Sequence, residues 1–177
     1  MATAKPFNLT EWIEDNKHLL QPPVANKNLY VDSGDYIVMI VGGPNARNDF
    51  HYNETEELFY QLEGTITVYI QEDGEKKAMP LSPGDLFLLP AKIPHSPVRT
   101  EGSIGLVIER KREKQGYQDG LLWFCNNCNH KLHEVYFELN DIEHDFLPHF
   151  TTFYNSEKLR MCSQCGYEMP VNSNFVK

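Results

Sequence analysis

The chain has 177 residues, of which 41% are hydrophobic and 12% aromatic, and it carries a formal net charge of −9. This length suits one domain, or one domain with a small appendage, and the hydrophobic content excludes a disordered chain. The negative charge argues against general binding of nucleic-acid phosphates, which requires clustered lysine and arginine side chains.

The sequence carries no signal for a membrane or for export. No stretch approaches the roughly 20 consecutive apolar residues that a transmembrane helix needs, so we expect no membrane partner. The first residues, MATAKPFNLTEW, lack the apolar core of a signal peptide, and we therefore expect a cytoplasmic protein.

A short helix is predicted near the N-terminus. Asn8 and Glu11 have the spacing of a helix-capping pair, and the segment at residues 9–17 places Trp12 and Ile13 on one apolar side. Two consecutive prolines at residues 22–23 exclude helix there and predict an extended crossing over the domain.

The middle of the chain is predicted to be β-structure. Runs of β-branched and aromatic residues are separated by turn signals, and Asp73-Gly74 marks a hairpin turn in a polar tip. Several short strands with no helices between them predict an antiparallel sandwich or barrel. The predicted strands are residues 36–41, 57–62, 65–71, 85–89 and 104–109.

A change of composition near residue 115 predicts a division into a barrel, residues 1–115, and a C-terminal segment, residues 116–177. The basic run RKREK at residues 110–114 is predicted to be a solvated strand end. Within the C-terminal segment a short helix is predicted at residues 141–154, limited by Pro148.

All four cysteines occur in CxxC pairs, Cys125 with Cys128 and Cys162 with Cys165. In a reducing compartment this pattern favours metal over disulfides, and four thiolates at this spacing are typical of tetrahedral zinc or a single iron. Four protein ligands leave no open position, so we expect a structural metal that clamps the C-terminal segment. The thiolates alone leave iron and zinc both open.

His51, Glu57 and His95 are candidate ligands of a catalytic metal; the alternative is that His51, which lies beside an acidic run, is an ordinary surface residue. Two imidazoles and one carboxylate form a facial set that leaves positions open on an octahedral metal, as in non-heme Fe(II) oxygenases. Six residues of straight strand span about 20 Å, so His51 and Glu57 can share a metal only if the chain turns between them. Residues 52–55 contain suitable turn residues, and residues 88–94 predict a buried strand and a proline-braced loop before His95.

Two stretches resemble the paired motifs of the cupin superfamily, whose fold is a small antiparallel jelly-roll barrel. Asn53 stands where the first motif usually has a second histidine, and Lys92 where the second motif usually has glycine. The resemblance implies an all-β cupin barrel with two histidines and one glutamate rather than the three-histidine, one-glutamate set of many cupins. The positions that fit are His51, Glu57, Gly64, Gly84, Pro90 and His95.

The whole chain resembles the 3-hydroxyanthranilate 3,4-dioxygenase family. The resemblance rests on the segments HLLQPPV, VGGPNARNDFH, EELFYQLEG, LLPAKIPHSPVR and LVIER and on the twin CxxC pairs. It implies an Fe(II) enzyme of NAD biosynthesis from tryptophan, with His51, Glu57 and His95 as the iron ligands. The implied reaction cleaves 3-hydroxyanthranilate with O2 to 2-amino-3-carboxymuconate semialdehyde, the precursor of quinolinate.

The resemblance also implies residues that bind the substrate. Arg47 and Arg99 are expected to hold its carboxylate, for which a bidentate guanidinium is the natural partner. Glu57 and Glu109 are expected at its metal-binding edge, with Glu109 as proton acceptor or as orienting group for an arginine, and Asn26 on the dioxygen side. The alternative for the arginines and Glu109 is an exposed ion pair.

Two other functions fit parts of the sequence. Another cupin dioxygenase, acting on a different catechol-like or thiol substrate, would use the same metal ligands. A regulatory module whose four-cysteine site contacts nucleic acid would fit the cysteines, but the acidic balance and the lack of a basic stripe disfavour it. The family resemblance further implies a homodimer.

Overall fold

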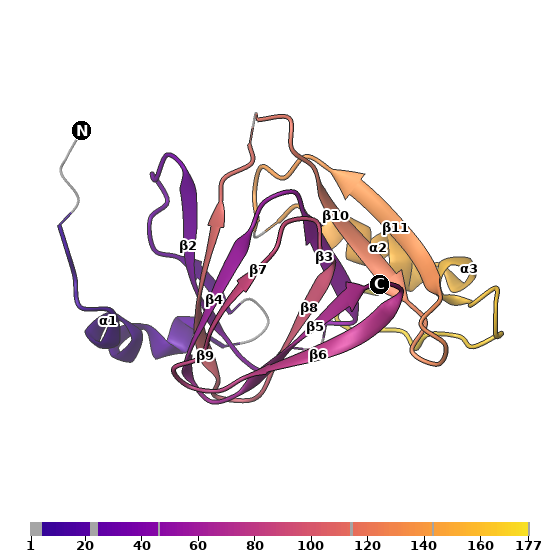
Figure 1. Cartoon of the computed structure of the whole chain (residues 1–177), viewed down its shortest axis with the longest axis horizontal. Coiled ribbons are helices and arrows are strands. Elements are labelled where there is room, and N and C mark those ends of the chain that lie inside the picture. Colours follow the sequence, from indigo (N-terminus) through magenta and orange to yellow (C-terminus); the bar gives the residue numbers. More distant parts are fainter. Residues whose placement is uncertain (1–4, 22–24, 46, 114, 143, 177) are drawn as a thin grey trace.

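The computed structural model describes residues 5–21, 25–45, 47–113, 115–142 and 144–176. Its strands form two antiparallel sheets that close on each other as a barrel (Figure 1). The predicted all-β antiparallel barrel with a short N-terminal helix is confirmed.

The first sheet has five strands in the order β1-β2-β9-β4-β7. Their bounds are β1 (Asn26–Asn28), β2 (Tyr36–Gly42), β4 (Glu57–Glu63), β7 (Leu86–Leu89) and β9 (Ile104–Arg110). The second sheet has six strands in the order β11-β10-β3-β8-β5-β6. Their bounds are β3 (Asp49–Asn53), β5 (Ile66–Glu72), β6 (Glu75–Leu81), β8 (His95–Arg99), β10 (Asp119–Phe124) and β11 (Lys131–Phe137).

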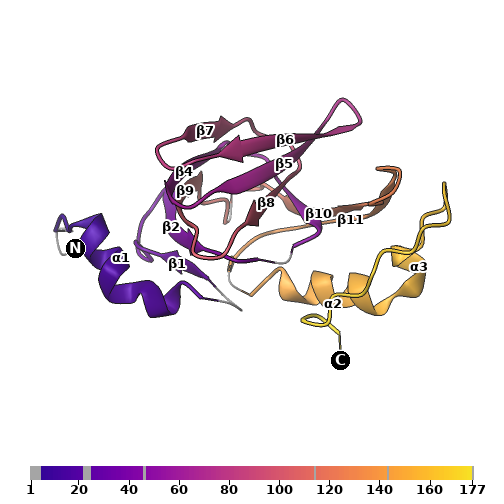
Figure 2. The ribbon, with the colours of Figure 1, turned by 90° about the horizontal axis from the view of Figure 1, so that it is seen from below.

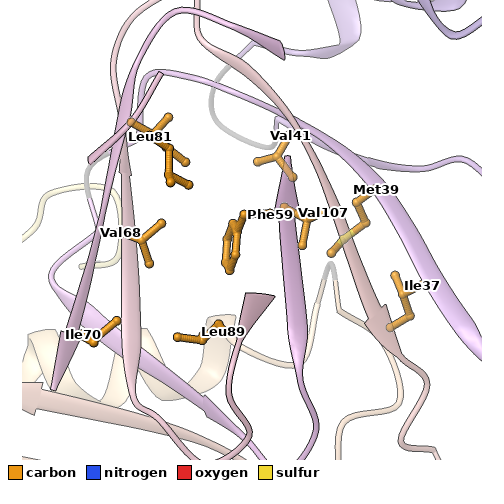
Figure 3. Close-up of a cluster of buried hydrophobic side chains, with 10 residues drawn as sticks. Ile37, Met39, Val41, Phe59, Val68, Ile70, Leu81, Leu89 and Val107 are labelled. Carbon is orange, nitrogen blue, oxygen red and sulfur yellow. The ribbon is translucent and has the colours of Figure 1, made fainter. Parts of the chain in front are cut away.

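The main hydrophobic core lies between the two sheets. Phe59 of β4 is at its centre in Figure 3, with Val107 of β9 on one side and Val68 of β5 on the other. Met39 of β2 joins this core, whereas the next residue, Ile40, belongs to a second cluster on the outer face of the sheet. β2 is apolar along most of its length because both of its faces are covered.

The helix α1 (Leu9–Asn16) provides that outer cover at one end of the molecule (Figures 1 and 2). Ile13 packs in the same cluster as Ile40. The predicted cap is confirmed, because the side chain of Asn8 accepts a hydrogen bond of 3.2 Å from the backbone N–H of Glu11. The 3-10 turn η1 (Lys17–Leu19) follows, and the predicted extended crossing at residues 22–23 lies outside the described residues.

At the opposite end, the C-terminal segment extends the six-stranded sheet and then covers it with helices (Figure 2). The helix α2 (Leu147–Asn155) packs on β10, where the rings of Trp123 and Phe153 stack with centroids 4.4 Å apart. The predicted helix at residues 141–154 therefore begins later than expected, with Pro148 in its first turn, where the missing N–H costs nothing. The helix α3 (Glu157–Arg160) follows.

Two predictions about exposure are wrong. β7, which was expected to be buried, alternates between two faces at the edge of its sheet, so Phe87 and Leu89 pack in the core, whereas Leu86 and Leu88 are 66% and 54% exposed. The basic run at residues 110–114 was expected to be solvated, but Arg112 is 2% exposed because it lies between two buried carboxylates. None of the helices in the described ranges is long and apolar enough to cross a membrane.

We expect Leu81→Ala to lower the free energy of unfolding by about 2–5 kcal/mol, because Leu81 is buried at 7% exposure in the core between the sheets. Leu86→Ala makes the same chemical change at 66% exposure and should change stability by less than about 0.5 kcal/mol. Urea unfolding of both variants tests this placement of the core, and equal losses would contradict it.

Candidate functional site

The three predicted metal ligands converge inside the barrel from both sheets. His51 on β3 and His95 on β8 are register partners in the six-stranded sheet, whereas Glu57 begins β4 in the five-stranded sheet. The chain crosses between the sheets at residues 54–56, which is the turn that the spacing requires. One ligand atom from each of the three buried side chains lies within 4.8 Å of the others.

This donor set fits a metal ion. Nδ1 of His95 lies 3.1 Å from the carbonyl oxygen of Ile93, so Nε2, which is 3.1 Å from Glu57, faces the group. Nε2 of His51 lies 2.7 Å from Asp119, which leaves Nδ1 of that ring for a metal. A hydrogen bond on the far ring nitrogen is the usual companion of a ligating histidine.

The charges of the group are coupled. Burial alone would raise the pKa of Glu57, but the adjacent His95 imidazole outweighs burial and lowers that pKa to about 2. For His95, burial alone would lower the pKa, but the Glu57 carboxylate outweighs burial, so the pKa of His95 is raised. Glu57 is therefore ionised, as a carboxylate ligand must be.

Asn53, which replaces the usual cupin histidine, binds two carboxylates instead of joining the ligand group. Its Nδ2 donates to Glu57 at 3.1 Å and to Glu109 at 3.5 Å, and its Oδ1 accepts from the backbone N–H of Thr55 at 3.1 Å. Glu57 and Glu109 are register partners on β4 and β9. Asn53 thus reaches across the barrel and orients both acids.

Glu109 is 2% exposed, so the predicted residue is buried rather than an exposed ion pair. Burial and the charge of Glu57 raise its pKa to about 7, against the Arg112 guanidinium, which lowers it. A carboxyl group in this range can exchange a proton near neutral pH.

Arg99 presents an unpartnered guanidinium to the barrel interior. It lies on the same face of β8 as His95 and is 4% exposed, and its buried Nη1 has no hydrogen-bond partner among the described residues. Burial lowers its pKa to about 10, while the charge of Glu57 opposes this shift. A methyl group on Gly105 would lie 3.0 Å from Nη1, so the glycine leaves this guanidinium room. A buried donor of this kind favours an acidic ligand.

Arg47 lies just before β3 and is already paired. Its Nε lies 3.2 and 3.1 Å from the two carboxylate oxygens of Asp49, to which Nη2 also donates, and its guanidinium carbon is 5.8 Å from the ring centroid of Phe146. The charges of Arg47 and Arg99 act on each other, and both act on Glu57. Both predicted arginines therefore lie within electrostatic reach of the ligand group.

Asn26 is placed less directly. It begins β1 at the edge of the five-stranded sheet, half-buried and opposite Val41. No side-chain hydrogen bond joins it to another residue in the described ranges, and its place on the dioxygen side stays a prediction.

The sequence reasoning missed three residues that contact the site. Asp119 bonds His51 from 68 positions along the chain, Arg112 pairs with both Asp119 and Glu109, and the ring of Phe146 lies 5.1 Å from the His51 ring. The charge of Arg112 next to an apolar strand was the one available signal. Asp119 and Phe146 have no local signal, because strand pairing and helix packing bring them to the site.

The four cysteines also converge, as predicted. The sulfur of Cys125 lies 3.6 Å from that of Cys165, and the sulfur of Cys128 lies 3.6 Å from that of Cys162. Four sulfurs bound at about 2.3 Å to a tetrahedral ion would be about 3.8 Å apart, so the spacing fits such an ion.

Two matching turns produce this arrangement. Four residues after the first cysteine of each pair, Asn129 and Gly166 adopt positive φ angles of 60° and 73°. Their backbone N–H groups donate to the carbonyls of Cys125 and Cys162, each at 2.9 Å. The two CxxC pairs therefore fold alike and present their thiols to a common point.

Comparison with known proteins identifies the family. Residues 1–154 match the sequence model described as 3-hydroxyanthranilic acid dioxygenase. The chain belongs to this family. A relative from Xanthomonas euvesicatoria pv. vesicatoria (strain 85-10), named 3-hydroxyanthranilate 3,4-dioxygenase, is 52% identical over 97% of this chain and 96% of its own length. One with the same name from Bacillus thuringiensis (strain Al Hakam) is 46% identical over 95% and 93%.

A solved structure with a similar backbone is a cupin-2 domain containing protein from Shewanella frigidimarina NCIMB 400. It is 19% identical and covers 55% of this chain and 91% of its own chain, with a TM-score of 0.46.

We expect Arg99→Met to raise the free energy of unfolding of the ligand-free protein by about 1–3 kcal/mol, because the change removes a buried donor that no described residue satisfies. Arg112→Met is the matched control. The same change there leaves Glu109 and Asp119 without their cationic partner and should lower the free energy of unfolding by about 3–5 kcal/mol. Urea unfolding without substrate or added metal measures both values, and a loss of stability in Arg99→Met would contradict the prediction.

Proposed function

We propose that this chain is a 3-hydroxyanthranilate 3,4-dioxygenase that binds Fe(II) through His51, Glu57 and His95. The observation that carries the proposal is the buried group of two imidazoles and one carboxylate beside the unpartnered guanidinium of Arg99. Membership of the family, and the names of relatives at 46% and 52% identity, support the same activity. The reaction adds both atoms of O2 to 3-hydroxyanthranilate and yields 2-amino-3-carboxymuconate semialdehyde, the precursor of quinolinate in NAD biosynthesis from tryptophan.

The arginines bind and orient the substrate. Arg99 donates to the substrate carboxylate, which satisfies the buried Nη1 that has no partner in the part of the chain that the structure describes. Arg47 approaches the same carboxylate with its remaining edge, because Asp49 occupies Nε and Nη2. Because the arginines hold the carboxylate, the hydroxyl and amino groups of the ring face His51, Glu57 and His95. Fe(II) held by these residues would bring the two groups and dioxygen together.

An acidic side chain of the site removes the proton of the substrate hydroxyl. Glu109 accepts the proton of the substrate hydroxyl, and the deprotonated ring becomes electron-rich enough to react with oxygen. Asn53 holds Glu109 and Glu57 through one amide group, so the base and the ligand keep their separation. The ring bond that breaks joins the hydroxyl-bearing carbon to its unsubstituted neighbour. Asn26 is assigned to the dioxygen side.

The remaining assignments follow from the resemblance and from the cysteine geometry. We assign a structural Fe or Zn to the four thiolates, because they surround one point and leave no open position. We divide the chain into a catalytic barrel, residues 1–115, and a segment packed on it, residues 116–177, which has its own aromatic cluster. We also propose a cytoplasmic homodimer without nucleic-acid or membrane partners, and light scattering tests the dimer.

A single assay tests the function. Protein is loaded with Fe(II) without oxygen and then given O2 and 3-hydroxyanthranilate, while oxygen uptake and the semialdehyde chromophore are followed. We expect one O2 consumed for each substrate cleaved. Bound iron without turnover would point instead to a cupin dioxygenase for another catechol-like or thiol substrate, which the same oxygen electrode can screen.

We expect Arg99→Ala to raise the KM for 3-hydroxyanthranilate by about 10- to 100-fold. This increase corresponds to the loss of charged hydrogen bonds that contribute about 1.5–3 kcal/mol. Iron content should stay unchanged, because Arg99 is outside the ligand group. By contrast, replacing His51, Glu57 or His95 by Ala should remove iron and activity together. An equal loss of iron and substrate binding in Arg99→Ala would indicate a structural role.

We expect Cys125→Ser to lower the unfolding midpoint strongly and to change kcat only slightly in the protein that stays folded. The reason is that its thiol belongs to a closed four-sulfur group on the C-terminal segment. Thermal unfolding, metal content and initial rates are measured on the same samples. A selective loss of turnover at unchanged stability would argue for a redox role.

A further inference from the structure

A fully buried arginine lies between two carboxylates near the proposed iron ligands. Arg112 follows β9 and is 2% exposed. Its Nε and Nη2 donate to the two carboxylate oxygens of Asp119, both at 2.8 Å, and its Nη1 donates to Glu109 at 2.8 Å. Nη1 also reaches the backbone carbonyl of Arg110 at 2.9 Å. The guanidinium is therefore fixed on two edges.

Asp119 connects this arginine to a ligand. Its Oδ1 lies 2.7 Å from Nε2 of His51, and the residue is 0% exposed. Its two carboxylate oxygens also accept from Arg112, so the side chain is held on both sides. A carboxylate on the far nitrogen of a ligating imidazole fixes the tautomer and orientation of the ring and raises its basicity.

We propose that Asp119 and Arg112 are positioning residues of the metal centre: Asp119 orients His51, and Arg112 holds Asp119 and Glu109 at a fixed separation. The inference rests on the proposed function, because it takes His51 as an iron ligand and Glu109 as the proton acceptor. Arg112 thereby joins the six-stranded sheet, which carries His51 and Asp119, to the five-stranded sheet, which carries Glu109.

This role requires the planar fork of a guanidinium. Arg112 makes charged contacts with two carboxylates at once, one of them through two parallel hydrogen bonds. A lysine ammonium at the same position keeps the charge but acts as a point donor without the fork geometry. Arg112→Lys therefore separates the geometric contribution of the side chain from its charge.

The first test compares Fe(II) binding by the wild-type chain and by Asp119→Asn, which keeps the shape of the side chain and removes its charge. The cysteine group is filled with Zn(II), and Fe(II) affinity is then measured without oxygen by competition with a chromophoric chelator. We expect affinity to fall by about 10- to 100-fold. A His51→Ala sample gives the background of Fe(II) bound elsewhere.

The second test compares Arg112→Lys with Arg160→Lys. Arg160 is also buried, at 8% exposure, and its Nη1 lies 2.6 Å from Glu168 and 2.8 Å from the carbonyl oxygen of Met169, but it belongs to the C-terminal segment. We expect Arg112→Lys to lower Fe(II) affinity and to raise the KM for 3-hydroxyanthranilate, each by about 10-fold. Arg160→Lys should lower the unfolding midpoint and leave both values unchanged.

The double variant decides whether Arg112 acts through Asp119. If it does, Arg112→Lys causes no further loss of Fe(II) affinity in a chain that already carries Asp119→Asn. Independent, additive losses would overturn the proposal, and so would unchanged Fe(II) affinity in both folded single variants. A wild-type chain that fails to bind Fe(II) or to cleave the substrate would instead contradict the proposed function.

Discussion

The contact between Glu57 and His95 joins the two sheets inside the barrel. Glu57 comes from the five-stranded sheet and His95 from the six-stranded sheet, and their side-chain atoms lie 3.1 Å apart with little solvent access. A buried charge costs several kcal/mol unless it is paired, so the two sheets must meet in a register that brings these groups together. The hydrophobic core around Phe59 lies between the sheets and sets their separation (Figure 3). The pairing of Glu57 with His95 constrains their alignment.

Two buried arginines on the same barrel have opposite roles. Arg112 has partners on two edges of its guanidinium and neutralises Glu109 and Asp119, so it stabilises the ligand-free protein. Within the described part of the chain, Nη1 of Arg99 has no partner, and the adjacent Gly105 leaves space around it. A buried donor without an acceptor lowers the stability of the ligand-free protein, and an acidic ligand that accepts its hydrogen bond restores that stability. The contrast separates an arginine whose hydrogen bonds are made within the protein from one that we propose binds the substrate.

The C-terminal segment contributes to the site as well as to the fold. Asp119, in the hairpin formed by β10 and β11, contacts the ring of His51. The ring of Phe146, just before α2, packs against the His51 ring and the Arg47 guanidinium. The matching turns at Asn129 and Gly166 fix the far end of this segment through the four thiols. A metal bound there would therefore hold in place a segment that reaches the ligand group, without contacting that group itself.

The sequence by itself determined the β class, the helix cap at Asn8 and the two CxxC pairs, because these features depend on residue type and short spacing, which the chain carries locally. The resemblance to a known family selected His51, Glu57 and His95 as candidate ligands, and their spacing added only the need for a turn between His51 and Glu57. Tertiary structure alone decided that Asn53 binds two acids, that Arg112 is buried and that Asp119 contacts His51. The contacts of Asn53 with Glu109 and of Asp119 with His51 join residues 56 and 68 positions apart. Arg112 is buried because β9 and β10, which belong to different sheets, bring Glu109 and Asp119 together around it. The exposure of β7 was decided in the same way, because only the order of strands in the sheet makes it an edge.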